Sequence, residues 1–155
     1  MKKTYVVCES CGKMNRAETE SEKPAVCGAC QAKLPMHGAI VNGSDRSFDK
    51  LVAKSPLPVV VDIWAQWCGP CRSFAPTFTN ASDEFAGRAV FVKLDSDANQ
   101  VSAGRLGIRS IPTILLFNNG VEVSRLSGAL PSHQFKQWLE QNLGELSVRI
   151  RTEGL

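Results

Sequence analysis

The six cysteines of this 155-residue chain all fall in Cys-x-x-Cys pairs, at positions 8 and 11, 27 and 30, and 68 and 71. Two thiols at this spacing can close a small disulfide ring, or they can turn both sulfurs toward one metal ion. In a reducing compartment such pairs indicate metal binding or thiol catalysis, whereas in a secreted protein they indicate structural disulfides. The pairing therefore predicts that these cysteines bind a metal or react, and are more than buried core side chains.

The third pair stands in the segment Trp67-Cys68-Gly69-Pro70-Cys71, between a predicted buried strand and a predicted helix start. Attack on a disulfide requires a thiolate, and a free cysteine is mostly protonated at neutral pH. Just before a helix, Cys68 would face unbonded backbone N–H groups and the positive end of the helix dipole, which stabilise a thiolate. Pro70 suits the first turn, where its missing N–H would have been unbonded anyway. We predict a nucleophile, Cys68, and a partner one turn later, Cys71.

The first two pairs have the spacing of a four-cysteine zinc site, with 15 residues between Cys11 and Cys27. Gly12 and Gly28 lie where a tight cysteine knuckle can require a positive φ. This segment has too few large apolar residues to fold without a metal. We predict one structural zinc ion, with a pair of regulatory disulfides, unliganded thiols and zinc released on oxidation as the alternatives. The predicted zinc ligands are Cys8, Cys11, Cys27 and Cys30.

No apolar segment is long enough for a signal sequence or a membrane span. The run after Met1–Lys3 is limited to Tyr5–Val7 ahead of Cys8, whereas a secretory signal needs roughly 7–15 apolar residues and a span ~20. We therefore expect a cytoplasmic protein with no membrane partner. The formal net charge of +3 is mild, and the cysteine-rich segment lacks the basic clusters and stacking residues of nucleic-acid readers. A binding module for protein or nucleic acid is the alternative function, and we expect no nucleic-acid partner.

Helix-like and strand-like segments alternate from Met36 onward. Helical periodicity predicts helices at about 45–54, 69–86, 98–106 and 131–143. Apolar or alternating runs predict strands at about 59–64, 89–94, 113–117 and 121–126. Ser44 or Asp45 is the expected N-cap of the first helix, and Gly107 and Gly144 are expected to end the last two. The order of elements indicates an α/β fold with a mixed central sheet flanked by helices.

The chain divides into three parts on composition. We expect a zinc-binding module at 1–37, a main domain at 38–145 and a C-terminal tail at 146–155. The tail alternates like an edge strand, and disorder is equally compatible with its sequence. We expect His37 and His133 to be surface residues. No function is assigned to the tail.

The segment Trp67–Cys71 resembles the active site of the thioredoxin family, and similar segments extend from about residue 44 to residue 144. The resemblance implies the thioredoxin fold, here with a small N-terminal zinc-ribbon-like module. The other matching segments are Val61–Ala65, Ala75-Pro76, Gly107–Thr113, Phe117–Gly120 and Gly128-Ala129.

The resemblance also implies roles for single residues. Cys68 would attack a target disulfide, and Cys71 would resolve the mixed disulfide with buried Asp62 as its proton acceptor. Lys93 would tune the pKa of that acid, and Pro112 would be cis. Ser127 is more polar than the apolar docking surface of the family. The residues expected to face the substrate are Trp67, Gly69, Pro70, Ile111, Pro112, Gly128 and Ala129.

With its four additional cysteines, the whole chain resembles the zinc-carrying bacterial type of this family, the thioredoxin 2 type. That implies an oxidoreductase that reduces protein disulfides and maintains cell redox homeostasis. Its partners would be disulfide-bearing target proteins and an NADPH-dependent thioredoxin reductase. We expect a monomer with no tightly bound organic cofactor.

Overall fold

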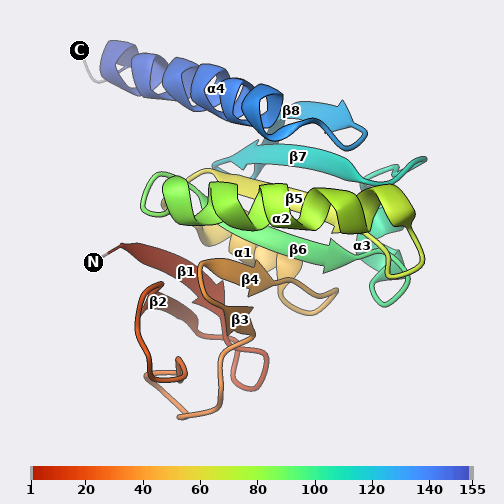
Figure 1. Ribbon diagram of the computed structural model, residues 1–155. Coiled ribbons are helices and arrows are strands. Elements are labelled where there is room, and N and C mark those ends of the chain that lie inside the picture. Colours follow the sequence, from red (N-terminus) through yellow and green to blue (C-terminus); the bar gives the residue numbers. More distant parts are fainter. Residues whose placement is uncertain (1, 154–155) are drawn as a thin grey trace.

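The computed structural model describes residues 2–153, and of residues 147–153 only the backbone (Figure 1). Eight strands and four helices follow one another in this part of the chain. The strands are β1 (Lys3–Val7), β2 (Met14–Glu18), β3 (Met36–His37), β4 (Ile40–Asn42), β5 (Val59–Trp64), β6 (Val90–Asp95), β7 (Thr113–Asn118) and β8 (Val121–Ser127). The helices are α1 (Phe48–Lys54), α2 (Gly69–Glu84), α3 (Gln100–Arg105) and α4 (Ser132–Glu153). None of these helices has both the length and the apolar surface needed to cross a bilayer.

The central sheet has the strand order β3-β4-β6-β5-β7-β8. Strands β4, β6 and β5 run parallel, whereas β3, β7 and β8 pair antiparallel with their neighbours. Because the carboxyl ends of parallel strands meet at one edge of a sheet, the segments after β4, β5 and β6 all emerge there. This edge carries Cys68, which follows β5. The mixed sheet flanked by helices confirms the predicted fold class.

Alternate residues of the strands build two cores, one on each face of the sheet. On one face, Val60, Phe91 and Leu116 pack against α2 and α4, together with a cluster of phenylalanine rings. The closest rings, Phe74 and Phe135, have centroids 5.0 Å apart in an edge-to-face arrangement. On the other face, Val61, Val92 and Leu115 pack against α1. Figure 1 shows α2 crossing the front of the sheet and α1 behind it.

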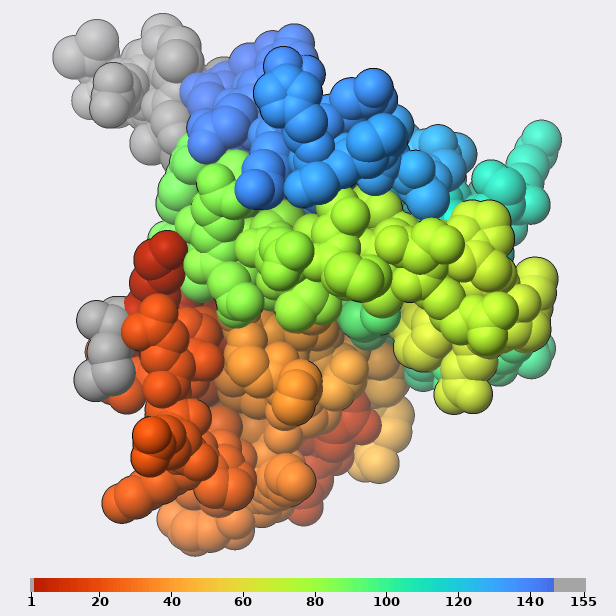
Figure 2. Space-filling model, in the orientation of Figure 1, coloured from red at the N-terminus to blue at the C-terminus, as the bar shows by residue number. Residues whose placement is uncertain are grey.

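The N-terminal segment is a small antiparallel hairpin of β1 and β2 that shares a core with the main domain. Buried Val6, Val7 and Leu34 belong to the same apolar cluster as Phe48 and Leu51 of α1. In the space-filling view, the red N-terminal residues lie directly against the orange and green parts of the chain (Figure 2). The hairpin is therefore packed on the α1 face of the sheet, a placement that the sequence had left open.

Two boundaries differ from the sequence-based expectation. Gly144 does not end the last helix, and the tail is not an edge strand, because α4 continues to Glu153. A glycine inside a helix costs about 1 kcal/mol, whereas burying a leucine contributes about 1.5–3 kcal/mol. Leu146, only 5% exposed, joins Leu139 in the core, and this burial outweighs the glycine. Tail residues 154–155 lie outside the described residues.

The N-cap expected for α1 is also wrong. The helix begins at Phe48 with Ser47 as its N-cap, because the side chains of Ser44 and Asp45 bond other segments. Gly107, with a φ of 65°, confirms the predicted left-handed end after α3.

Candidate functional site

Cys68 and Cys71 lie at the first turn of α2 and form a disulfide, with their Cα atoms 5.2 Å apart. Cys68 is the N-cap of the helix, and its extended backbone brings its sulfur over the helix terminus. The backbone N–H of Cys71 donates to Cys68 Sγ at 3.2 Å. The same N–H would stabilise a thiolate on Cys68, because the first N–H groups of a helix have no partner within it. The positions of these two cysteines confirm that a strand-to-helix turn presents the pair.

Two loops, which carry Ile111-Pro112 and Gly128, lie beside the pair. Cys68 Sγ lies 3.8 Å from the carbonyl oxygen of Ile111, and the peptide bond between Ile111 and Pro112 is cis, as the resemblance implies. The N–H of Gly128 donates to the carbonyl of Pro112 at 2.9 Å, which joins the two loops. Cys71 is 1% exposed and Cys68 4%. Little of the disulfide is therefore open to solvent.

The rim of the site has open surface on both sides of the disulfide. Trp67 is 69% exposed, and no neighbouring atom lies within 4 Å of where a Cβ would stand on Gly69 or Gly128. Pro70 and Ala129 are also exposed, whereas Ile111 is half-buried and Pro112 buried. Of the seven residues expected to face a substrate, the structure brings Ile111, Pro112 and Gly128 together beside Cys68.

Asp97 is a site residue that the sequence reasoning missed. Its Oδ2 atom accepts a hydrogen bond of 2.7 Å from the indole Nε1 of Trp67. The signal was available in principle, because Asp97 stands two residues after the end of β6, whose carboxyl end lies beside that of β5. A polar residue at that place on the edge can reach the segment that carries Cys68.

Asp62 is a fully buried carboxyl group on β5. It lies on the same side of the strand as Val60, because alternate residues share a face, and that face is covered by α2. Neither carboxyl oxygen has a hydrogen-bond partner within the described part of the chain. Burial raises the pKa of Asp62 to about 7, and the charge of Lys93 offsets part of this effect. Such a group can exchange a proton near neutral pH.

Lys93 stands directly beside Asp62 in the parallel register of β5 and β6. Its ammonium group lies 4.4 Å above the ring centroid of Trp64, a cation–π contact. The Trp64 ring holds the Lys93 side chain near the sheet. From there the positive charge of Lys93 lowers the pKa of Asp62.

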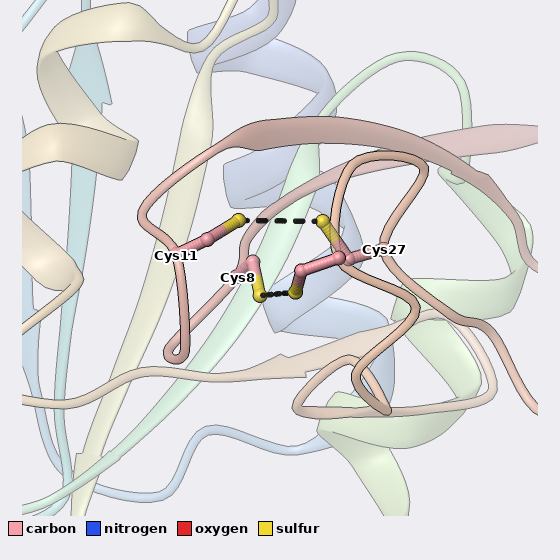
Figure 3. A group of neighbouring side chains, drawn as sticks. Cys8, Cys11 and Cys27 are labelled. Atoms are coloured by element: carbon pink, nitrogen blue, oxygen red, sulfur yellow. Dashed lines mark hydrogen bonds between the residues drawn. The ribbon is translucent and has the colours of Figure 1, made fainter.

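The remaining four cysteines form one compact cluster (Figure 3). Their sulfur atoms all lie within 4.8 Å of one another, and two pairs, Cys8 with Cys30 and Cys11 with Cys27, are 3.6 Å apart. Four sulfurs at a Zn–S distance of about 2.3 Å in a tetrahedron are about 3.8 Å from one another. The donor set and its spacing therefore fit a zinc ion. Cys8 and Cys27 are buried, and Cys11 and Cys30 are exposed.

The two knuckles have the same backbone hydrogen bonds. In the first, Cys8 N donates to Lys13 O and Gly12 N donates to Cys8 O. In the second, Cys27 N donates to Ala32 O and Gln31 N donates to Cys27 O. Gly12 has a φ of 80°, as predicted. The expectation for Gly28 is wrong, because the left-handed position of the second knuckle is one place after Cys30, where Gln31 has a φ of 61°.

Polar groups also surround one of the buried sulfurs. The N–H of Ala29 and the side-chain amide of Asn15 donate to Cys27 Sγ at 3.4 and 3.5 Å. The backbone N–H groups of Cys30 and Ala29 lower the pKa of Cys27 to about 6, with Asn15 adding to the effect. A thiolate is the form that binds a metal, so these donors prepare Cys27 as a ligand.

Comparison with known proteins gives consistent relatives. The family model described as "Thioredoxin" matches residues 39–141. Thioredoxin C-3 of Corynebacterium nephridii is 42% identical over 142 residues, which cover 89% of this chain and 94% of that protein. The thioredoxin of Haemophilus influenzae is 39% identical over 104 residues, 67% of this chain and 97% of its own length. The thioredoxin of Synechocystis sp. is 45% identical over 100 residues, 64% of this chain and 94% of its own.

Replacing Asp62 with asparagine is expected to stabilise the folded chain at alkaline pH. The folded pKa of about 7 lies above the ordinary value of 3.8, so the folded state holds the proton more tightly than the unfolded state. Wild-type stability is then complete below about pH 4, falls as the pH rises to about 7 and is constant above that. At about pH 8 the variant should be more stable by up to about 4 kcal/mol. Urea unfolding of both oxidised proteins across this pH range measures the difference, and an equal pH dependence in both would contradict it.

Proposed function

The chain belongs to the thioredoxin family, and from this premise we propose how its residues divide the work of reducing a disulfide. It is a thiol–disulfide oxidoreductase that exchanges the dithiol of Cys68 and Cys71 with target disulfides through a mixed disulfide. One observation carries this function: the disulfide sits at the first turn of α2, with a backbone N–H directed at Cys68 Sγ.

The reaction proceeds by two exchanges of sulfur. The Cys68 thiolate attacks one sulfur of the target disulfide, and the other target sulfur leaves as a thiolate. Cys71 then loses its proton and attacks Cys68 Sγ, which expels the second target sulfur as a thiolate. The target gains two electrons, and the chain keeps the 68–71 disulfide. A further donor must then supply two electrons to restore the dithiol.

We propose that Asp62 accepts the proton that Cys71 loses. Cys71 is almost fully buried, so solvent is a poor acceptor, and Asp62 lies on the face of the sheet that α2 covers. A pKa of about 7 makes its carboxylate a suitable base near neutral pH. Lys93 would set that pKa, because its charge opposes the effect of burial.

The seven rim residues, Trp67, Gly69, Pro70, Ile111, Pro112, Gly128 and Ala129, are proposed to receive the target chain. Support comes from the joined loops beside Cys68, which leave backbone and apolar surface open around the disulfide. Ser127 is exposed next to this surface and makes that edge polar. We propose that Ser127 affects which targets dock rather than the sulfur chemistry.

We further propose that residues 1–37 form a zinc module, residues 38–145 the thioredoxin domain and residues 146–155 a tail, as in a zinc-carrying thioredoxin of the thioredoxin 2 type. The support is the four-cysteine cluster, its two equivalent knuckles and the donors around Cys27. Bound zinc would cross-link the two knuckles, and the four cysteines would be its only ligands. The alignment with thioredoxin C-3 covers 89% of the chain and therefore extends into this module.

A reducing compartment, the cytoplasm, is proposed as the location, because four cysteines outside any disulfide are typical of such a compartment. The proposed electron donor is an NADPH-dependent thioredoxin reductase, and the proposed targets are disulfide-bearing proteins. Together they maintain cell redox homeostasis.

Substitution of the two active-site cysteines tests the division of labour. With thioredoxin reductase, NADPH and a disulfide-bonded protein as substrate, Cys68→Ser should abolish NADPH consumption and form no mixed disulfide. Cys71→Ser should instead accumulate the target on Cys68, because the second exchange cannot occur. Nonreducing gels and mass spectrometry detect the adduct. Trapping on Cys71 in the first variant would reverse the assignment.

Asp62→Asn tests the proton acceptor. Release of a target from the mixed disulfide should slow by about a hundredfold or more at pH 7, since a positioned general base typically contributes about 10²–10⁴-fold. In the wild type the rate should rise with pH through about 7, as Asp62 loses its proton, and this rise should be missing in the variant. Stopped-flow release from a preformed mixed disulfide gives both rates. Equal rates and pH profiles would leave Asp62 with a structural role alone.

Metal analysis tests the module. The reduced chain should bind one zinc ion, and Cys8→Ser should weaken binding by more than about a hundredfold, beyond the loss that outer-sphere partners cause. Cys71→Ser is the matched control, because it removes a thiol outside the cluster and should leave the stoichiometry unchanged. Titration against a chromogenic chelator measures both. A reduced wild-type chain that binds no zinc would reject the module.

A further inference from the structure

We propose that Glu9, which lies between the two cysteines of the first knuckle, is a positioning residue for Trp67 at the redox site. The inference rests on the proposed function, because it concerns how the reductase presents its rim to a target. A path of hydrogen bonds, joined by short covalent links within the chain, leads from Glu9 through residues 44–47 and 95–102 to the indole of Trp67.

Glu9 binds the segment that follows β4. Its Oε1 atom accepts a hydrogen bond from the hydroxyl of Ser44 at 2.5 Å and another from the hydroxyl of Ser47 at 3.2 Å. The two hydroxyls also lie 3.1 Å from each other. Hydrogen bonds to a charged group contribute more than those between neutral groups, so the carboxylate holds both serines in place. This explains why the Ser47 side chain, at the N-cap of α1, makes no capping bond of its own.

A second contact fixes the same knuckle on α1. The ammonium group of Lys50 donates to the carbonyl of Gly12, directly after Cys11. Glu9 is thus held at the N-cap of α1, and Gly12 is held by Lys50 within that helix. The geometry of the knuckle, which the cysteine cluster sets, therefore determines where the Glu9 carboxylate lies relative to Ser44.

Asp45, the next residue after Ser44, joins this segment to α3. Its backbone N–H donates to Oδ1 of Asn99 at 3.0 Å, and its own Oδ1 accepts from the N–H of Ser102 at 2.8 Å. Asn99 is the N-cap of α3 and makes no side-chain capping bond there. Asp45 supplies that cap from another part of the chain, and the bonds to Ser102 lower its pKa. The start of α3 consequently depends on the position of residues 44–47.

The turn between β6 and α3 completes the path to the active site. The side chain of Asn99 donates to the carbonyl of Asp95 at 3.1 Å. Oδ1 of Asp95 in turn accepts from the N–H of Asp97 at 2.9 Å. Asp97 then accepts the indole N–H of Trp67 at 2.7 Å. Trp67 is covalently joined to Cys68, so the last member of the path forms the rim beside the attacking sulfur.

Other contacts of the N-terminal module reach different parts of the domain. Lys2 donates to the carbonyls of Asp83 and Glu84, at the far end of α2 from Cys68, and the apolar residues of β1 pack on α1. These contacts attach the module to the domain. The Glu9 contact differs from these because it leads, through residues 44–47 and 95–102, to the indole of Trp67.

Removal of the Glu9 carboxylate should therefore loosen residues 44–47, the first turn of α3 and the Trp67 ring. Chemistry at the sulfurs uses the first turn of α2 and Asp62, which this path does not contain. We expect weaker docking of protein targets with little change in the exchange step. The effect should appear in KM rather than in kcat.

The test compares Glu9→Ala, Glu9→Gln and Glu20→Ala in the full chain. Glu20 is exposed in the same module, so Glu20→Ala is the matched control, and Gln at position 9 keeps an oxygen acceptor. In nitrogen-15 NMR spectra, the Trp67 indole signal, assigned with Trp67→Phe, should shift in Glu9→Ala, and the Ser102 amide should exchange faster with solvent. KM for a disulfide-bonded protein should rise about fivefold, the equivalent of one hydrogen bond, with kcat within about twofold. Glu9→Gln should restore most of both, and Glu20→Ala should match the wild type.

Two further arms decide the outcome. Adding Glu9→Ala to Asp97→Ala should cause no further rise in KM, because both changes cut the same path. Should Glu9→Ala fail to fold, Ser44→Ala combined with Ser47→Ala removes the same bonds from the other side and must shift the Trp67 signal. Unchanged Trp67 and Ser102 signals, or additive KM effects with Asp97→Ala, would overturn the proposal. A wild type that reduces no protein disulfide would reject the proposed function instead, and the NMR arms would still decide on Glu9.

Discussion

The chemistry of this chain depends on the first turn of α2, where the backbone N–H of Cys71 donates to the sulfur of Cys68. A thiolate in that position is stabilised by backbone N–H groups that have no partner within the helix. The turn keeps its place because the rest of the helix is anchored on the sheet by buried Phe74 and Phe78. Parallel strands then bring the loops after β4 and β6 to the same edge. The fold thus places polar backbone groups at the sulfur and loops for a target around it.

A second constraint comes from the buried acid of β5. A carboxyl group without a hydrogen-bond partner is costly in a core, and Asp62 is surrounded by residues that fill the space between the sheet and α2. Its raised pKa makes the ionised form unfavourable for the fold and suitable for accepting a proton. Lys93 moderates the cost from the adjacent strand. Stability and the proposed proton transfer therefore set opposite demands on Asp62.

The N-terminal module is stabilised in a different way from the main domain. A segment of this size has few large apolar residues, and it combines a cluster of four cysteines with a share of the core under α1. Buried Cys8 and Cys27 belong to that core, while Cys11 and Cys30 face outward. The module is consequently part of the packing of the domain, and polar contacts from its first knuckle extend toward the edge that carries the redox pair.

The sequence by itself determined the local chemistry: three cysteine pairs, the strand-to-helix turn at Cys68, the order of most strands and helices, and a buried acid on β5. These follow from spacing and periodicity, which act over a few residues. Tertiary structure decided what depends on contacts distant in sequence. Helix α4 continues past Gly144 because Leu146 is buried in the core. Asp45 caps α3 instead of α1. Asp97 accepts a hydrogen bond from Trp67 at the edge of the sheet. Local propensities of about 1 kcal/mol or less are readily outweighed by such contacts, so the sequence pattern alone could not predict them.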